Sequence, residues 1–175
     1  EKIGFEISYV DNDEEGLIDF EHLKSLIRED TVLVSICALN GEIGIRQPLK
    51  MIRQIIKKVN PNTLLHSDLA QAIGKIAINL HDVDIASISS HKIFGPKNFG
   101  VFYHSERVKI YPLIFGNGID DLLPVTYSLP DVVAFEKALI ISFVGTVILG
   151  FIIIPILKKL KIGQVVRDDG PQSHL

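Results

Sequence analysis

Residues 66–100, HSDLAQAIGKIAINLHDVDIASISSHKIFGPKNFG, are the stretch that decides the fold. An apolar run at its start ends in Asp68, and Gln71 follows three residues later. A second apolar run, residues 83–88, leads into a Ser-Ser-His-Lys segment that ends at Lys92. If both runs are strands, they bring a carboxylate and a lysine to one edge of a sheet, and that edge is where open α/β sheets bind ligands.

The side chains at this edge have the chemistry that an aldehyde cofactor needs. A lysine such as Lys92 can bond covalently to an aldehyde when its amine is neutral. An aspartate such as Asp68, at the end of a buried strand, can pair with a protonated pyridine nitrogen. Gln71 can donate to a ring oxygen, and Ser89 and His91 can bind phosphate oxygens. Together these residues suit pyridoxal phosphate.

The same residues also have simpler interpretations. Asp68 can cap a helix that follows it. Lys92 can be a solvated charge, as lysines mostly are, and the Ser-His-Lys segment can be a polar turn. Residue types alone leave these alternatives open, whereas the ordered combination of residues favours the cofactor site.

The ordered motifs resemble those of the class V aminotransferase family and, within it, the cysteine desulfurases. The matching runs are H-x-D-x-A-Q-x-x-G-K from His66 and S-x-H-K-I-x-G-P-K-x-x-G from Ser89. The resemblance extends from about Gly4 to Lys137 and includes VLVSICALNGEIG, residues 32–44. It implies an α/β fold in which a three-layer, mostly parallel sheet forms part of the large domain of a pyridoxal phosphate-dependent transferase of fold type I.

In the family, the lysine of the His-Lys pair carries the cofactor, and this position is Lys92. The resemblance places Asp68 at the pyridine nitrogen, Gln71 at the phenolic oxygen, and Ser89 and His91 at the phosphate. It implies pyridoxal 5'-phosphate as the cofactor and L-cysteine as the substrate. Sulfur would pass to an acceptor protein for iron–sulfur cluster or thio-cofactor assembly, leaving alanine. It also implies a homodimer, or another chain that covers the domain.

Two segments depart from the family pattern. The family usually has Asn-Asn-Glu-Ile-Gly where this chain has Asn40-Gly41-Glu-Ile-Gly, and its second Asn contacts the cofactor. Asn40 is the candidate that replaces this contact. The family loop that reaches a partner subunit's cofactor phosphate corresponds to residues 124–130, which lack its basic and glycine positions. We therefore expect the chain alone to be a poor catalyst.

Sequence patterns along the rest of the chain predict the other elements. Residues 5–10 alternate apolar and polar side chains, which predicts a strand. The continuous apolar run at residues 31–37 predicts a parallel strand covered on both faces, with Cys37 as a small core residue. Helices are predicted at residues 20–28, capped by Asp19, and from Pro48 to Val59, with further strands at 64–68 and 101–104.

Bulk composition sets broader limits. The 175 residues carry a net charge of −3 with a pI of about 6.1, so the sequence has no basic footprint for nucleic acid. The single cysteine excludes an internal disulfide and fits a reducing compartment. The resemblance places such a protein in the cytoplasm or the mitochondrion.

The C-terminal part of the chain has a different character. Residues 138–157 hold no charged side chain, and lysines follow within residues 158–161. About 20 residues at ~1.5 Å each span a ~30 Å hydrocarbon layer, so this segment predicts a membrane helix, with a buried helix as the alternative. Ser142, Thr146 and Gly150 recur every fourth residue and can pack on another helix.

The chain thus divides into residues 1–137, a partial cofactor-binding large domain, residues 138–161, a hydrophobic helix able to span a membrane, and residues 162–175, a polar tail. The family's opening strands and small domain have no counterpart in this sequence, so we expect one sheet edge to be unpaired unless another chain covers it. Two functions remain. One is a truncated or divergent cysteine desulfurase-like enzyme, and the other is a non-catalytic, membrane-anchored interaction subunit derived from that family.

Overall fold

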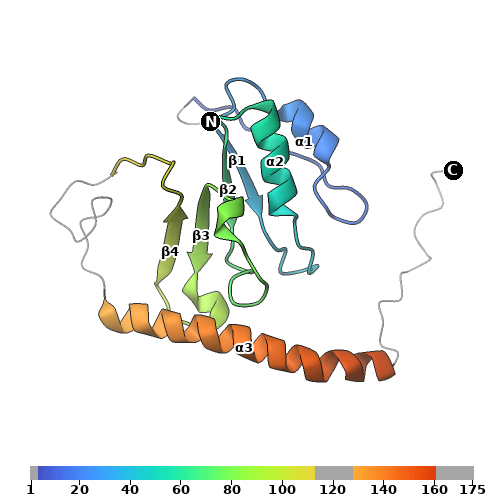
Figure 1. The fold of residues 1–175 in the computed structure, drawn as a ribbon, viewed down its shortest axis with the longest axis vertical. Coiled ribbons are helices and arrows are strands. Elements are labelled where there is room, and N and C mark those ends of the chain that lie inside the picture. Colours follow the sequence, from blue (N-terminus) through green and yellow to red (C-terminus); the bar gives the residue numbers. More distant parts are fainter. Residues whose placement is uncertain (1–3, 113–127, 161–175) are drawn as a thin grey trace.

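The computed structural model describes residues 4–112 and 128–160, and it contains a four-stranded sheet. The strands are β1 (Leu33–Cys37), β2 (Leu64–Asp68), β3 (Ile85–Ser89) and β4 (Gly100–His104). They lie in the order β1-β2-β3-β4, which is also their order along the chain (Figure 1). β1 and β3 both pair in parallel with β2, whereas β4 is antiparallel to β3.

Three α-helices and two short 3-10 helices accompany the sheet in the described ranges. They are α1 (Phe20–Leu26), α2 (Leu49–Val59), η1 (Leu80–Asp82), η2 (Ser90–Ile93) and α3 (Leu129–Lys159). α1 and α2 lie together on one side of the sheet, and α3 crosses the edge at which β3 ends (Figure 1). The predicted α/β class, with a mostly parallel sheet and a C-terminal apolar helix, is confirmed.

Local sequence accounts for the bounds of the two shorter helices. The Asp19 carboxylate accepts hydrogen bonds from two backbone N–H groups in the first turn of α1, so it caps this helix as predicted. α1 ends at Leu26, before the predicted end at residue 28. Pro48 occupies the N-cap of α2, where a missing N–H costs little, and Asn60 ends this helix.

The core lies between the sheet and the pair formed by α1 and α2. Leu65 of β2 and Ala86 of β3 are fully buried, as are Ile52 and Ile56 of α2. Side chains alternate between the two faces of a strand, so burial of every second residue marks the covered face. Burial of a large apolar side chain contributes roughly 1.5–3 kcal/mol, which makes this layer the main source of stability.

The opposite face of the sheet is open to solvent in the described part of the chain. Leu33, Ser35 and Cys37 of β1 are exposed, while Ile36 is buried. The prediction that this strand is covered on both faces is therefore wrong, and so is the assignment of Cys37 to the core. The period of two places Cys37 on the open face, where its thiol donates to the Leu39 carbonyl at 3.1 Å.

Residues 5–10 form no strand, which contradicts the prediction. A strand needs a partner, and no backbone group of this segment bonds to another described backbone group. The segment is held instead by a side chain. The guanidinium of Arg28 donates through two nitrogens to the Glu6 carboxylate, each at 3.2 Å.

A buried carboxylate fastens α2 to the sheet. Asp84 is 2% exposed and accepts from Arg53 at 3.1 Å, from Lys57 at 3.0 Å and from the Leu65 backbone N–H at 2.9 Å. Burial favours the neutral acid, but these three donors outweigh it and lower the pKa of Asp84 below its ordinary value. The folded state therefore favours the ionised form of this group.

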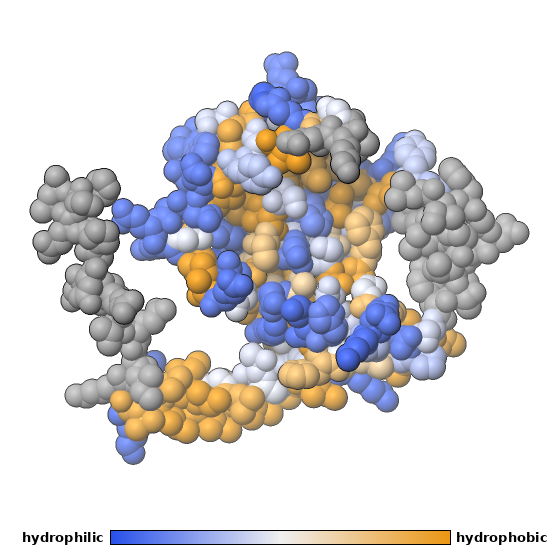
Figure 2. Space-filling view, turned by 180° about the vertical axis from the view of Figure 1, so that it is seen from behind, coloured by the Kyte–Doolittle hydropathy of each residue, from blue (hydrophilic) through white to orange (hydrophobic). Residues whose placement is uncertain are grey.

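α3 runs without a break from Leu129 to Lys159. Its most apolar stretch has a mean hydropathy of 2.7 and is 0% buried, so by length and composition it is able to cross a membrane. Figure 2 shows these side chains as a hydrophobic band along one side of the molecule. Among the described residues nothing buries this helix, which contradicts the buried-helix alternative for this part of the chain. The predicted polar tail at 162–175 and most of the divergent loop at 124–130 lie outside the described residues.

Candidate functional site

Parallel pairing brings the predicted site residues to one edge of the sheet. The Cα partners of Asp68 are Cys37 in β1 and Ser87 in β3. Ser89 ends β3 at the same edge, and η2 continues the chain directly to Lys92. Asp68 thus ends β2, and the turn that carries Lys92 follows the end of β3, the adjacent parallel strand. Both lie at the edge where α/β sheets bind ligands.

Asp68 is exposed, and one of its carboxylate oxygens is already used. Oδ1 accepts a hydrogen bond from the Ala70 N–H at 2.8 Å, which closes a turn. Residues 70–76 form turns and a bend, so the helix-cap interpretation of Asp68 is wrong. The other carboxylate oxygen has no partner within the described ranges and can accept a bond from a ligand.

Gln71 follows in this turn and is oriented by Lys75. The Lys75 Nζ donates to Gln71 Oε1 at 3.0 Å. Because the carbonyl is occupied, the carboxamide offers its N–H₂ group to a ligand. This orientation suits the role expected for Gln71, which is donation to a ring oxygen. Lys75 is not among the predicted site residues, and its spacing of four from Gln71 is the signal that identifies it.

Gly41 provides the room that Gln71 occupies. A Cβ placed on residue 41 would lie 2.8 Å from Gln71 Cδ and 3.0 Å from Gln71 Nε2, closer than real side chains pack. An asparagine at residue 41 and this position of Gln71 therefore exclude each other. The glycine that stands in place of the expected second Asn is thus what leaves room for this position of Gln71.

Asn40 is exposed, and its side chain stabilises its own turn. Its Oδ1 accepts from the backbone N–H groups of Glu42 at 2.9 Å and of Ile43 at 3.3 Å. The side-chain oxygen is therefore used locally. The N–H₂ group is what Asn40 has left to offer a ligand.

The turn that carries the lysine is built on a buried serine. Ser90 is fully buried, and its hydroxyl donates to a carbonyl of the following loop at 2.8 Å. A Cβ on Gly95 would collide with Ser90 Oγ, so the loop closes this tightly only with glycine at that position. His91 and Lys92 are exposed. The Ser89 side chain makes no cap hydrogen bond, so this serine is the one available to a phosphate.

The groups at this edge fit a phosphorylated pyridine aldehyde. Asp68 would offer a carboxylate oxygen to a pyridine nitrogen, and Gln71 would offer an N–H₂ group to a ring oxygen. Ser89 and His91 would offer a hydroxyl and a ring nitrogen to phosphate oxygens. The exposed amine of Lys92 lies in the same turn as these two residues.

His66 links three strands on the open face, next to the site. Ser35 Oγ lies 2.8 Å from His66 Nδ1, and Ser87 Oγ lies 3.2 Å from His66 Nε2. Burial lowers the pKa of His66 from its ordinary value, and the Asp68 carboxylate opposes part of this shift. His66 is not among the predicted site residues. Its position two residues before Asp68 on one strand is the signal that places both on the same face.

α3 packs against the turn that carries Lys92. Ser142 Oγ donates to the Ile93 carbonyl at 3.0 Å, and a Cβ on Gly74 would lie 3.3 Å from Ser142 Cβ. A hollow of about 360 Å³ is lined by Lys92, Lys75 and this part of the helix. The small residue Ser142, predicted to pack on another helix, packs on the body of its own chain.

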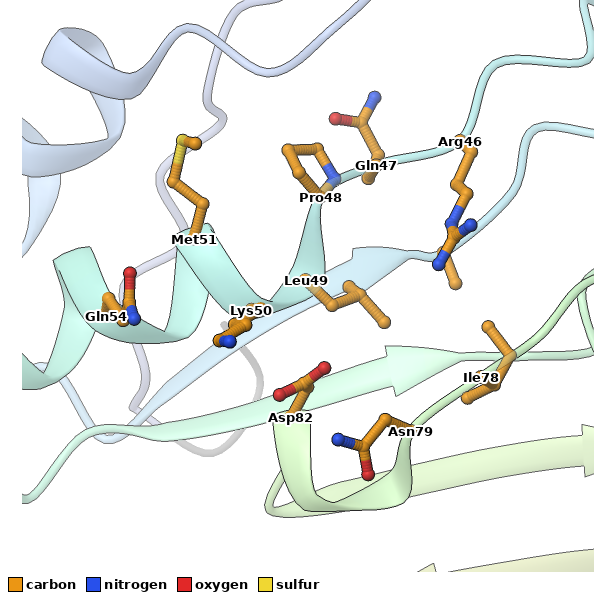
Figure 3. A pocket seen from close by; sticks show the side chains of 11 residues that line it. Arg46, Gln47, Pro48, Leu49, Lys50, Met51, Gln54, Ile78, Asn79 and Asp82 are labelled. Carbon is orange, nitrogen blue, oxygen red and sulfur yellow. The ribbon is translucent and has the colours of Figure 1, made fainter.

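A separate hollow of about 280 Å³ opens at the start of α2 (Figure 3). Arg46, Lys50, Asn79 and Asp82 line it together with apolar side chains. No predicted cofactor residue belongs to its lining. This hollow is therefore distinct from the edge formed by Asp68 and Lys92.

Comparison with known proteins identifies relatives. A family model described as aminotransferase class-V matches residues 1–129. The mitochondrial cysteine desulfurase of Candida maltosa is 46% identical over 140 residues, which cover 77% of this chain and 28% of that protein. The cysteine desulfurase IscS of Histophilus somni is 46% identical over 122 residues, which cover 67% of this chain and 30% of that protein. The chain thus spans 28–30% of the length of these relatives.

Solved structures share the fold. A NifS-like protein superposes with a TM-score of 0.75 at 42% identity, covering 81% of this chain and 40% of that chain. SspA, solved in complex with cysteine, superposes with a TM-score of 0.71 at 31% identity, covering 79% of this chain and 41% of SspA. DndA from Streptomyces lividans superposes with a TM-score of 0.76 at 29% identity, covering 94% of this chain and 48% of DndA.

Proposed function

The chain belongs to the class V aminotransferase family, and we propose that it forms part of a pyridoxal phosphate-dependent, cysteine desulfurase-like enzyme. The observation that supports the proposal best is the arrangement of Asp68 and the Lys92 turn at the ends of adjacent parallel strands. When bound, pyridoxal phosphate supplies an electron-poor ring that weakens bonds in an attached amino acid.

Each proposed site residue has a role that its surroundings support. The Lys92 amine holds the cofactor, and the free oxygen of Asp68 keeps the pyridine nitrogen protonated. Gln71 donates its N–H₂ group to the phenolic oxygen. Ser89 and His91 bind the phosphate.

A further contact comes from Asn40. Its side-chain oxygen is engaged in its own turn, so we propose that its N–H₂ group approaches the cofactor. This contact replaces the one that the family makes from the residue at Gly41. Because it comes from a neighbouring position in the turn, we expect weaker cofactor binding than in the family.

The substrate and partners are inferred from the relatives. Those named above are cysteine desulfurases, and SspA was solved with cysteine. We infer that L-cysteine is the substrate, that alanine is a product and that an acceptor protein receives the sulfur for iron–sulfur cluster or thio-cofactor assembly. The names of these relatives give no support to a non-catalytic subunit.

The domain division follows from the same proposal. Residues 1–137 form the partial cofactor domain, 138–161 the hydrophobic helix and 162–175 the tail. By resemblance to the family, the protein acts as a homodimer or with a covering partner chain. The compartment is the mitochondrion, as for the Candida relative, or the cytoplasm.

The cofactor assignment is tested by absorbance. Purified protein is titrated with pyridoxal phosphate, and the visible band of lysine-bound cofactor is recorded. We expect the band in the parent protein and its loss in Lys92→Ala. Lys97→Ala is the matched control, because Lys97 is an exposed lysine of the same loop. Absence of the band in the parent, or its persistence in Lys92→Ala, contradicts the proposal.

We further propose that α3 inserts into a lipid bilayer, because its apolar stretch is long enough to span one and is 0% buried. Leu139 and Ser142 contact the body of the protein at Gly74, so insertion requires that the helix leave this position. Carbonate extraction of membranes from expressing cells tests this proposal. Release of the protein into the soluble fraction contradicts it, and retention supports it.

A further inference from the structure

α3 contacts the body of the protein at the turn that carries Lys92. Ser142 Oγ donates to the Ile93 carbonyl at 3.0 Å, and Ile93 directly follows Lys92 in η2. Among the described elements, η2 is the one that α3 contacts most. A second contact, between the rings of Phe135 and Phe99, joins the start of the helix to the loop that follows η2. Both contacts fix the helix to the segment that holds the cofactor lysine.

Ile93 is buried at the place where α3 approaches Gly74. Its side chain is 1% exposed, and a Cβ on Gly74 would lie 3.2 Å from Ile93 Cγ2. The same Cβ would lie 3.3 Å from Ser142 Cβ and 3.6 Å from Leu139 Cδ1. The helix and Ile93 therefore pack against the same glycine. If α3 leaves, Ile93 loses neighbours on one side and its apolar side chain becomes exposed to water, which is unfavourable.

The turn also contains a strained residue. Phe94 ends η2 with a φ of 60°, in the left-handed region that bulky side chains rarely adopt. Such a conformation persists only where the surrounding structure holds it in place. The Gly95 N–H, which donates to the Ser90 carbonyl at 3.1 Å, is one such contact. The bond that α3 makes to the carbonyl just before Phe94 is another, and its loss would let the turn relax.

We propose that docking of α3 on η2 and cofactor binding at Lys92 stabilise each other, so that insertion of α3 into a lipid bilayer weakens cofactor binding. The coupling rests on the proposed cofactor site and on the proposed membrane insertion, and it links the two. The docked helix holds the turn in one conformation through the carbonyl and the buried side chain of Ile93. In the inserted form, Ser142 lies within the bilayer and no longer reaches this carbonyl.

The coupling acts in both directions. Two binding equilibria that bias one structural element shift each other by the same factor. Cofactor bound at Lys92 therefore favours the docked helix and opposes insertion, whereas the bilayer favours the inserted helix and releases cofactor. A ligand shifts an equilibrium only by its difference in affinity for the two states. The uncharged stretch at residues 138–157 gives the bilayer this difference, because it enters the hydrocarbon layer in one state alone.

A disulfide between α3 and the body tests the coupling. In a Cys37→Ser background, Gly74→Cys and Ser142→Cys place two Cβ atoms 3.3 Å apart, close to the roughly 3.5–4.5 Å that a disulfide spans. The oxidised full chain keeps α3 docked, and a phosphine reductant releases it. Each form is titrated with pyridoxal phosphate, with and without vesicles of phosphatidylcholine, a lipid that has no primary amine to bind the aldehyde. The visible band of lysine-bound cofactor gives the dissociation constant.

We expect the vesicles to raise the dissociation constant of the reduced form by at least about fivefold and to leave that of the oxidised form unchanged. Saturating cofactor should also increase the fraction of reduced protein that carbonate releases from the vesicles. Equal dissociation constants for the reduced form with and without vesicles overturn the coupling, and so does an equal rise in the oxidised form. A parent chain that shows no band, or that carbonate releases completely, contradicts the proposed function itself, and the coupling falls with it.

A second variant keeps the test decisive, because Gly74 has a φ of 71° and any side chain there is strained. Ser142→Ala removes the donor to the Ile93 carbonyl and adds no strain. It should weaken cofactor binding about fivefold without vesicles. Thr146→Ala is the matched control, because Thr146 lines the same hollow as Ser142 and its hydroxyl makes no hydrogen bond to the described body. Equal dissociation constants for Ser142→Ala and the parent overturn the coupling.

Discussion

Gly41 and Gln71 are packed so closely that a Cβ on residue 41 would come within 2.8 Å of Gln71 Cδ. The same carboxamide accepts a hydrogen bond from Lys75 through its Oε1. Two features therefore hold Gln71 in the position proposed to reach the cofactor. Gly41 has no side chain and leaves room for the carboxamide, and the Lys75 ammonium group binds its oxygen. Changes at residue 41 should act on the cofactor through Gln71.

Replacement Gly41→Ala should weaken cofactor binding by about fivefold, the equivalent of one hydrogen bond of ~1 kcal/mol. The added Cβ displaces Gln71, whose N–H₂ group then no longer reaches the ring oxygen. The dissociation constant is measured by absorbance titration with pyridoxal phosphate. In a Gln71→Ala background the same replacement should have no further effect. An equal loss in both backgrounds contradicts the mechanism.

Replacement Gly95→Ala should lower the free energy of unfolding by about 1–3 kcal/mol, as expected for overpacking. The new Cβ would collide with Ser90 Oγ and lie 3.0 Å from the Ser90 carbonyl oxygen, which is backbone and cannot move aside. Urea denaturation measures the change. Gly145→Ala in α3 is the control, because a Cβ there meets nothing within 4 Å. Gly145→Ala should equal or exceed the parent in stability, because alanine favours a helix over glycine. A stability of Gly95→Ala equal to that of the parent would show that the loop tolerates the added atom.

Replacement Asp84→Asn should destabilise the protein by about 3 kcal/mol, because it leaves the charges of Lys57 and Arg53 without their buried partner. The pKa of Asp84 is lowered in the folded state, so its contribution is present above its ordinary value of 3.8 and is lost as pH falls through the folded value. Urea denaturation should show the difference between parent and variant shrinking in strong acid. Glu29→Gln, at an exposed carboxylate, should match the parent.

His66 should make stability depend on pH near neutrality. Its folded pKa is lowered from the ordinary value of 6.5, so the unfolded chain binds the proton more tightly. Stability should therefore fall as pH drops from about 7.5 to about 5.5, and His66→Asn should remove part of this slope. Urea midpoints at both pH values measure it. An unchanged slope in His66→Asn would rule out this role.

The edge that carries the site was predictable from sequence because strand ends and motifs coincide there. The apolar run that ends in Asp68 and the run before Lys92 are both strands, and parallel pairing brings their ends together. The resemblance, predicted from about Gly4 to Lys137, overlaps the matched family model, which covers residues 1–129, along almost its whole length. Short-range pattern and motif order are enough for this part of the fold.

Burial was harder to predict, because it depends on what covers each face. A period of two tells which residues of β1 share a face, but it does not tell which face is covered, so Cys37 was misplaced. Residues 5–10 have a strand's pattern but lack the partner that makes a strand. The contact between Lys75 and Gln71 is not predictable from sequence. It depends on the turn that joins the two residues, and the sequence alone does not define this turn.

The hydrogen bond from Ser142 to the Ile93 carbonyl has a mechanical consequence. Ile93 follows Lys92 directly in the chain and is 1% exposed, so it cannot shift without disturbing its neighbours. A 31-residue helix attached at this point acts as a lever arm. Tension applied to its far end would act on this bond, and on the other contacts of the helix such as Phe135 with Phe99, and so reach the segment that carries the amine.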